Sequence, residues 1–212
     1  MQAVDGIFYV VVLIMSVVVH EFAHGYVAYL LGDQTARAEG RLTLNPIKHL
    51  DLFGSILLPL LLVLSKAGFV IGWARPVPYN PNNLKNGKTG EMLVAVSGIL
   101  VNILLALIFG LFIRFAPILG FAPYDALALL PIYKIATIIV LVNLVLAVFN
   151  IIPIPPLDGS KILFALIPAQ YRNFENFLER FGMFLLLFFI IFLWAKVAPV
   201  IFVVFSVITG IH

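Results

Sequence analysis

Four long apolar segments alternate with shorter polar ones along the chain, at residues 6–31, 91–115, 131–154 and 181–207. An α-helix rises about 1.5 Å per residue, so each segment can cross the roughly 30 Å hydrocarbon core of a bilayer. The last segment contains Lys196 and Pro199, so it is either one kinked helix or two shorter ones. The pattern predicts an all-α polytopic membrane protein built on a bundle of long transmembrane helices.

A fifth apolar stretch, residues 52–71, is less easily interpreted. Its apolar core, residues 52–64, is short for a span, and Ser65-Lys66-Ala67-Gly68 interrupts it. The stretch is either a re-entrant hairpin, which gives up to six membrane segments, or a full crossing. We favour the hairpin because it leaves only Arg114 and Lys134 in the outer loop, as the positive-inside rule requires. The cations it places inside are Arg37, Arg41, Lys48, Arg75, Lys85, Lys88, Lys161, Arg172 and Arg180.

Two polar segments next to this stretch have the pattern of extended chain. Residues 35–45 contain β-branched residues and an alternating pattern, which favour strand over helix. Residues 72–81 contain Pro76, Pro78 and Pro81, which disfavour helix. We expect a small extended or β element near the cytosolic face, whose free edge can accept a substrate strand.

The composition excludes several classes of protein. Hydrophobic residues make up 63% of the chain and charged residues only 11%, against about 25% charged in a typical soluble domain. The net charge of +3 is spread over loops, which argues against nucleic-acid binding and fits a bilayer-embedded protein. There are no cysteines, so disulfides are excluded and any bound metal ion needs histidine and carboxylate ligands. We expect one membrane-embedded domain over residues 1–212.

The first apolar segment contains His20-Glu21-Phe22-Ala23-His24. The two histidines lie one helical turn apart on one face, the spacing that lets both bind one zinc ion, with Glu21 beside the metal as a general base. Ionisable groups at such depth in a bilayer are costly and usually functional. The motif therefore predicts a zinc hydrolase with its site inside the membrane.

A catalytic zinc site needs a third protein ligand and leaves its fourth position to water. Asp158 is the strongest candidate, because it follows a proline-broken stretch at the inner end of the third long segment. Gly159 comes directly after it and permits a sharp turn. The alternative is that Asp158 only caps a helix or closes a turn.

Three motifs together resemble the site-2 protease family of zinc intramembrane metalloproteases, peptidase family M50. They are His20-Glu21-x-x-His24, then Ser97-Gly98-x-x-x-Asn102, then Asn150-x-x-Pro153-x-x-Pro156-x-Asp158-Gly159. The chain is most similar to the compact prokaryotic branch, without a PDZ or CBS domain.

The resemblance implies one zinc ion per chain, held by His20, His24 and Asp158, with Glu21 as general base. It implies that Asn150 donates to the oxyanion of the scissile carbonyl. The expected activity is cleavage of transmembrane segments of membrane proteins. The expected location is the cell membrane, with the active site nearer the cytosolic side.

Two other functions remain open: a catalytically silent member of the same fold that binds membrane segments, and a metal-ion transporter. Asn150 has the alternative role of satisfying backbone groups that the prolines free, and Asn102 and Asn143 fit interhelical hydrogen bonds better than chemistry. We expect His49 at the membrane interface. Ion pairs along one helix face are expected among Arg172, Glu175, Glu179 and Arg180. The sequence indicates neither the physiological substrate nor the oligomeric state.

Overall fold

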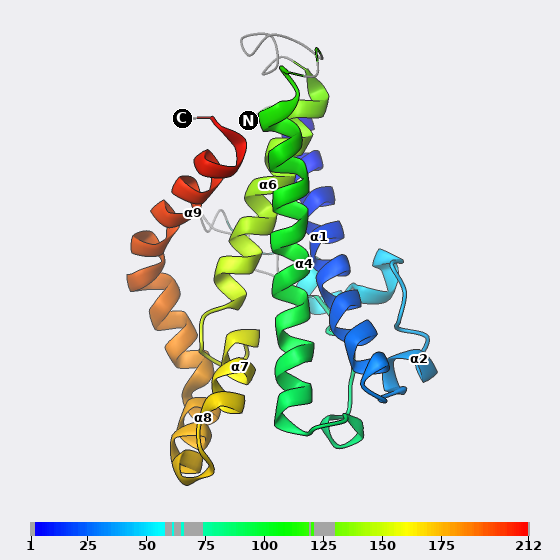
Figure 1. Ribbon diagram of the computed structural model, residues 1–212, viewed down its shortest axis with the longest axis vertical. Coiled ribbons are helices and arrows are strands. Elements are labelled where there is room, and N and C mark those ends of the chain that lie inside the picture. Colours follow the sequence, from blue (N-terminus) through cyan, green and yellow to red (C-terminus); the bar gives the residue numbers. More distant parts are fainter. Residues whose placement is uncertain are drawn as a thin grey trace.

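The computed structural model describes residues 3–57, 61, 65, 74–118, 120 and 130–211. Three long helices, α1 (Ala3–Leu30), α4 (Lys88–Phe115) and α6 (Pro131–Asn150), lie side by side with alternating direction (Figure 1). A fourth helical run returns along them and consists of α8 (Arg172–Phe188), η5 (Phe189–Leu193) and α9 (Trp194–Thr209). The short elements are α2 (Thr35–Ala38), η1 (Pro46–His49), η2 (Leu52–Leu57), η3 (Pro81–Asn83), α7 (Asp158–Leu166) and η4 (Ala169–Tyr171).

The predicted transmembrane segments are confirmed as helices. Within the described residues, four helical stretches are long and apolar enough to span a bilayer: Phe8–Leu30, Lys88–Phe115, Pro131–Asn150 and Arg172–Thr209. The third stops at Asn150, short of the predicted residue 154, because the prolines that follow cannot continue a helix. The chain is thus a multi-pass membrane protein.

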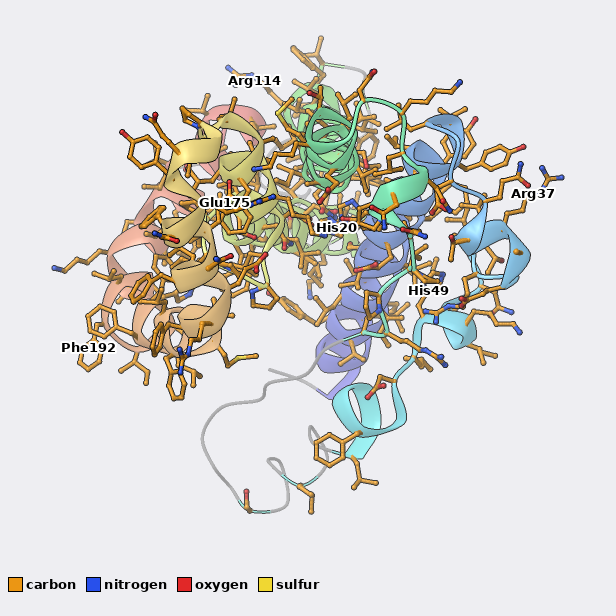
Figure 2. The ribbon with its side chains drawn as sticks, turned by 90° about the horizontal axis from the view of Figure 1, so that it is seen from below. His20, Arg37, His49, Arg114, Glu175 and Phe192 are labelled. Atoms are coloured by element: carbon orange, nitrogen blue, oxygen red, sulfur yellow. The ribbon has the colours of Figure 1, made fainter. Side chains whose placement is uncertain are left out.

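The fourth stretch is one continuous helical run with a local irregularity. It spans 38 residues, and the π-helical turn η5 lies just before α9, which contains Pro199. Proline lacks the N–H of a regular helix, and single π-helical turns occur as local irregularities inside α-helices. Its side chains mostly face outward, as Phe192 does in Figure 2, where lipid would cover them.

The first and last residues of the segment 31–85 meet at one end of the bundle. The backbone N–H of Lys85 donates to the carbonyl of Leu31 at 2.9 Å, so the end of α1 lies beside the approach to α4. The chain therefore leaves and re-enters the bundle at the same end. The predicted re-entrant hairpin covers residues 52–71, of which the structure describes only 52–57, 61 and 65, and it stays a prediction.

The expected β element is not found in the described part of the chain. Residues Thr35–Ala38, predicted as strand, form the short helix α2. The local cause is Asp33, whose carboxylate accepts from both the N–H and the hydroxyl of Thr35 and closes a turn there. Residues 74–80 are not helical, in agreement with their prolines, but they do not pair as a strand.

The core lies mainly between α4, α6 and α9, and α4 also contacts α1 and α7. Ala106, Tyr133, Val140 and Phe205 are among the buried residues of this cluster. Small side chains let the helices approach closely, which is how helices associate in lipid. Between α6 and α7 the chain is unwound over residues 151–157, and the Pro155–Pro156 peptide bond is cis.

One smaller expectation was wrong, and another stays a prediction. His49 is buried within the protein, at 1% exposed, and its Nε2 hydrogen-bonds the carbonyl of Thr43 at 2.8 Å, while its position at the membrane interface stays a prediction. Glu175 pairs with Lys88 of α4 at 2.7 Å rather than with a neighbour on its own helix, because α8 returns alongside the start of α4. This pair is partly exposed and links two helices at the end of the bundle (Figure 2).

Asp33 ties the end of α1 to the segment before α4. Its buried carboxylate accepts hydrogen bonds from Thr35, from the backbone N–H of Asn80 at 2.9 Å and from Asn83 Nδ2 at 2.8 Å. Burial by itself would raise the pKa of Asp33, but these donors favour the charged form and lower the pKa below its ordinary value.

We expect Asp33→Asn to lower the free energy of unfolding by about 1–3 kcal/mol near neutral pH, because it removes the charge that these donors face. The unfolded state binds the proton more readily, so this stabilisation is present above the ordinary Asp pKa of about 3.9 and is lost as pH falls through the lower folded-state pKa. Thermal unfolding in detergent over a pH series measures the difference. The exposed Glu39→Gln is the control, and an equal loss in both variants would contradict the assignment.

Candidate metal centre

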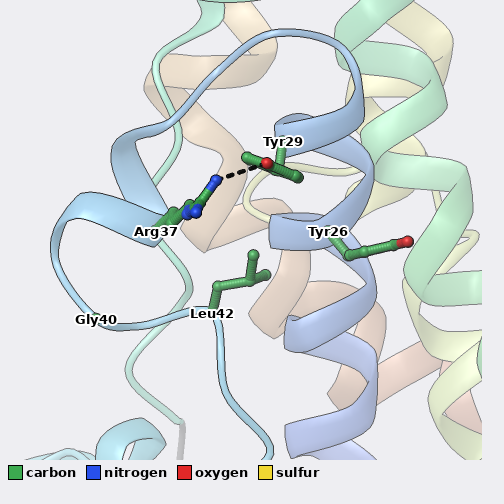
Figure 3. Close-up of a pocket in the computed structure, with 5 residues that line it drawn as sticks. All are labelled: Tyr26, Tyr29, Arg37, Gly40 and Leu42. Carbon is green, nitrogen blue, oxygen red and sulfur yellow. Dashed lines mark hydrogen bonds between the residues drawn. The ribbon is translucent and has the colours of Figure 1, made fainter.

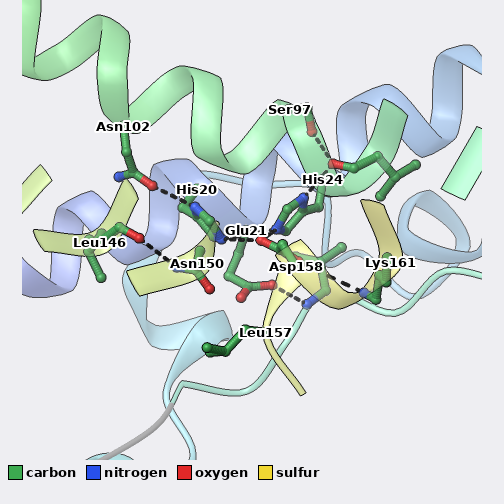
Figure 4. A network of polar contacts seen from close by, with 12 residues as sticks. His20, Glu21, His24, Ser97, Asn102, Leu146, Asn150, Leu157, Asp158 and Lys161 are labelled. Carbon is green, nitrogen blue, oxygen red and sulfur yellow. Dashed lines mark hydrogen bonds and ion pairs between the residues drawn. The ribbon is translucent and has the colours of Figure 1, made fainter. Parts of the chain in front are cut away.

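The structure brings His20, His24 and Asp158 together in the interior of the bundle. The Nε2 atoms of the two histidines are 3.0 Å apart, and Asp158 Oδ2 lies 3.1 Å from His20 Nε2 and 3.0 Å from His24 Nε2. All three residues are buried, and each offers one atom to a common point. Figure 4 shows the three side chains converging from α1 and α7.

Both imidazoles are held from behind through Nδ1. His20 Nδ1 lies 2.6 Å from Asn102 Oδ1, and His24 Nδ1 lies 2.7 Å from the carbonyl oxygen of Val94. A carbonyl oxygen only accepts, so each Nδ1 carries the proton. Each Nε2 of a neutral ring then presents a lone pair to the centre of the cluster.

Three hydrogen-bond acceptors thus face one another without a donor. Among the residues that the structure describes, none donates a hydrogen bond to the fully buried Asp158 Oδ2, and protons on both Nε2 atoms would repel each other at 3.0 Å. Such a group is stable when a cation lies between its members. Tetrahedral zinc with bonds of about 2.0–2.1 Å separates its ligand atoms by about 3.3 Å, close to the distances here. The residues present therefore fit a zinc ion with one position left for water.

Local structure explains how each candidate ligand reaches the site. His20 and His24 are one turn apart on α1, as the motif predicts. Asp158 is the first residue of α7, where the chain resumes helix after the unwound residues 151–157. The following Gly159 is required, because a Cβ there would collide with the backbone of Ile151.

Lys161 is a neighbour of the site that the sequence motifs did not indicate. Its Nζ lies 4.0 Å from Asp158 Oδ1 and 5.1 Å from the centre of the Tyr79 ring. Lys161 lies one turn after Asp158 on α7, so it comes close to the site because α7 begins at Asp158. The ammonium partly balances the carboxylate oxygen that faces away from the histidines.

Glu21 is held by the backbone of the non-helical segment 74–80. Its Oε2 accepts from the N–H of Val77 at 2.9 Å. Arg41 fixes the same segment, because its Nη2 donates to the carbonyls of Arg75 at 2.9 Å and Pro76 at 3.1 Å. The prolines of this segment predict extended chain here, but nothing in the sequence identifies a backbone amide aimed at the glutamate.

Asn150 makes a local hydrogen bond. It ends α6, and its Nδ2 donates to the carbonyl of Leu146 at 3.0 Å (Figure 4). This bond corresponds to the backbone-satisfying alternative, and the oxyanion role stays a prediction. Asn102 and Asn143 do bond across helices as predicted, at 2.7 Å.

Gly98 on α4 permits the histidines to pack against that helix. A Cβ at this position would lie 2.6 Å from His20 Cε1 and would also collide with His24 Cε1. In the sequence, Gly98 stands out only as part of the Ser97-Gly98-x-x-x-Asn102 motif. The structure gives it a steric reason, since only glycine leaves room for both rings.

A separate hollow of about 330 Å³ lies beside the end of α1 (Figure 3). Its lining includes Tyr26, Tyr29 and Arg37, and Arg37 Nη1 donates to the Tyr29 hydroxyl at 2.6 Å. None of the lining residues belongs to the metal cluster.

A bundle of apolar helices that encloses two histidines and a carboxylate defines a membrane-embedded metalloprotein, and His-Glu-x-x-His is the motif of zinc metallopeptidases. The model of Peptidase family M50 matches residues 8–192. The chain therefore belongs to peptidase family M50, a zinc-dependent metalloprotease family.

Relatives agree with this membership. YwhC of Bacillus subtilis, named as a candidate zinc metalloprotease, is 40% identical over 190 residues, which cover 90% of this chain and 80% of YwhC. Rip2 of Mycolicibacterium smegmatis, named in the same way, is 29% identical over 74% of this chain and 57% of its own length. Rip2 of Mycobacterium tuberculosis is 28% identical over 76% of this chain and 58% of its own length. No solved structure matches the chain significantly.

We expect Gly98→Ala to weaken zinc binding by more than about 100-fold, because the added methyl group displaces both histidine rings and not merely a supporting residue. Zinc affinity by chelator competition on the detergent-purified protein tests this. Gly6→Ala is the matched control, since a Cβ there has no neighbour within 4 Å. Unchanged affinity in Gly98→Ala would contradict the close packing of the rings against α4.

Proposed function

We propose that the protein is a zinc-dependent intramembrane endopeptidase that cleaves transmembrane segments of membrane proteins. The observation that carries the proposal is the buried convergence of His20, His24 and Asp158 with Glu21 next to them, inside a bundle of membrane-spanning helices. Membership in peptidase family M50 supports proteolysis as the activity.

The chain's own residues supply the proton transfers. When bound, zinc acidifies water and polarises a carbonyl group. Glu21, the residue after His20, takes a proton from the attacking water and later returns it to the leaving amine. The Val77 N–H holds one carboxylate oxygen of Glu21, so the other oxygen remains for this exchange.

Asn150 completes the proposed machinery as a donor to the developing oxyanion. In the structure its Nδ2 is bonded to the Leu146 carbonyl, so this role requires the side chain to turn from its own helix toward the substrate. Its place at the end of α6, just before the unwound residues 151–157, favours such a movement, because fewer helical neighbours restrain it.

The substrate must be locally extended, because a carbonyl within a helix is already hydrogen-bonded and covered. We place the site nearer the cytosolic face, since the His pair lies in the second half of α1 and the cations Arg37 and Arg41 follow that helix. Segment 74–80 borders Glu21 and is a natural neighbour for an unwound substrate strand.

We expect one zinc ion per chain in the wild type and loss of stoichiometric zinc in both His20→Ala and Asp158→Ala. Removing a ligand costs more than the roughly 10–100-fold that loss of a supporting residue costs. Elemental analysis of detergent-purified protein measures the metal content. The exposed Glu39→Ala should keep its zinc. Stoichiometric zinc of unchanged affinity in Asp158→Ala would remove this residue from the ligand set.

We expect Glu21→Gln to keep one zinc ion but to lower cleavage by about 10²–10⁴-fold, because glutamine cannot accept the proton. The assay uses proteoliposomes that contain a single-span membrane protein with glycine and proline in its span. Glu179→Gln, on the exposed face of α8, is the control for charge loss. Full cleavage by Glu21→Gln would refute the mechanism, and no cleavage by the wild type would favour a binding role.

A further inference from the structure

A chain of polar side chains runs from His20 into the apolar interior of the bundle. Asn102 Oδ1 meets His20 Nδ1 at 2.6 Å, and Asn102 Nδ2 donates to Asn143 Oδ1 at 2.7 Å. Asn143 Nδ2 in turn donates to Ser16 Oγ and to the carbonyl oxygen of Ile139, both at 2.9 Å. Asn102 and Asn143 are fully buried, so no water competes for these bonds. The chain links α1, α4 and α6.

The orientation of each amide in this chain follows from its last member. The backbone carbonyl of Ile139 can only accept, so Asn143 must turn its NH2 group toward it. Asn143 then presents its oxygen to Asn102, so Asn102 must donate through its own NH2 group. The Asn102 oxygen is thereby left facing His20, whose Nδ1 must carry the proton.

We propose that Asn143 is a positioning residue that fixes the tautomer of His20 through Asn102. This inference rests on the proposed role of His20 as a zinc ligand. Without the oxygen of Asn143, the Asn102 carboxamide can rotate and present its NH2 group to His20. The ring then shifts its proton to Nε2, and the lone pair that the metal needs is lost.

His24 provides an internal comparison within the same site. Its Nδ1 bonds directly to the carbonyl of Val94, with no amide side chain between them. A carbonyl of the backbone cannot exchange its acceptor for a donor. The tautomer of His24 is therefore independent of Asn143, although both histidines approach the same point.

The test compares Asn143→Leu with Ser16→Ala. Leucine removes both polar ends of Asn143 at similar size. Ser16→Ala removes one acceptor but leaves the Ile139 carbonyl, so the direction of the amides persists. A merely structural polar cluster would respond to both substitutions.

Two measurements are made on each protein. The ¹⁵N chemical shifts of the histidine side chains in metal-free protein show whether Nδ1 of His20 carries a proton, and His20→Gln assigns that signal. Chelator competition gives the zinc affinity. We expect Nδ1 to be protonated in wild type and Ser16→Ala, with zinc affinities within about twofold, and Asn143→Leu to lose that proton and to bind zinc about 10–100-fold more weakly.

A second background keeps the test independent of folding defects. In Asn102→Asp both side-chain oxygens accept, so rotation can no longer offer a donor to His20. We expect the double variant Asn102→Asp with Asn143→Leu to regain the Nδ1 proton and tighter zinc binding than Asn143→Leu alone. Failure of this rescue, or an unchanged His20 signal in Asn143→Leu, would overturn the inference. Absence of zinc in wild type would instead overturn the proposed function, because the His20 signal is read without metal.

Discussion

The structure is organised around three unprotonated acceptor atoms that meet inside a bundle of apolar helices. The Nε2 atoms of His20 and His24 and Asp158 Oδ2 lie 3.0–3.1 Å from one another, and no donor from the described part of the chain lies between them. Such a group is costly in a medium that solvates charge poorly, and a bound cation offsets that cost. Several local features follow from this requirement. Gly98 lets α4 approach the two rings, and the unwound residues 151–157 allow α7 to begin with Asp158 at the right depth.

The hydrogen bonds that orient the two histidines end at backbone carbonyl groups. The Val94 carbonyl orients His24 directly, while the Ile139 carbonyl is connected to His20 through two carboxamides. Backbone carbonyls accept and never donate, so they define a direction along a hydrogen-bond chain that amide side chains alone do not define. In the buried interior of the bundle, that direction extends across three helices. The same residues also hold α1, α4 and α6 together, so the metal site and helix packing share their interactions.

At one end of the bundle a second set of contacts arranges the polar segments next to the site. Asp33 holds the region of Asn80 and Asn83, and Arg41 holds the carbonyls of Arg75 and Pro76. The segment between these contacts reaches Glu21 through the amide of Val77. The orientation of Glu21 thus depends on the segment 74–80, which follows residues 52–71 in the sequence. The opposite flank of the molecule is different, because α8 and α9 expose large apolar side chains and contribute no ligand.

The long helices and the histidine pair of this protein could be predicted from its sequence, for physical reasons. Helices that span a bilayer need about 20 apolar residues, and a metal-binding pair on one helix face needs a spacing of four, so the bundle and the His20–His24 pair could be predicted. Asp158 could be proposed because prolines unwind the chain before it, and a resemblance to known proteases narrowed its role. Tertiary structure alone decided that Asn143 lies at the end of a chain leading to His20, that Val77 faces Glu21, and that His49 is buried. The replacement of a predicted strand by α2 has a local cause instead, because the carboxylate of Asp33 closes the turn at Thr35. Sequence periodicity fixes which residues share a face of one helix, whereas contacts between helices depend on how those faces pack.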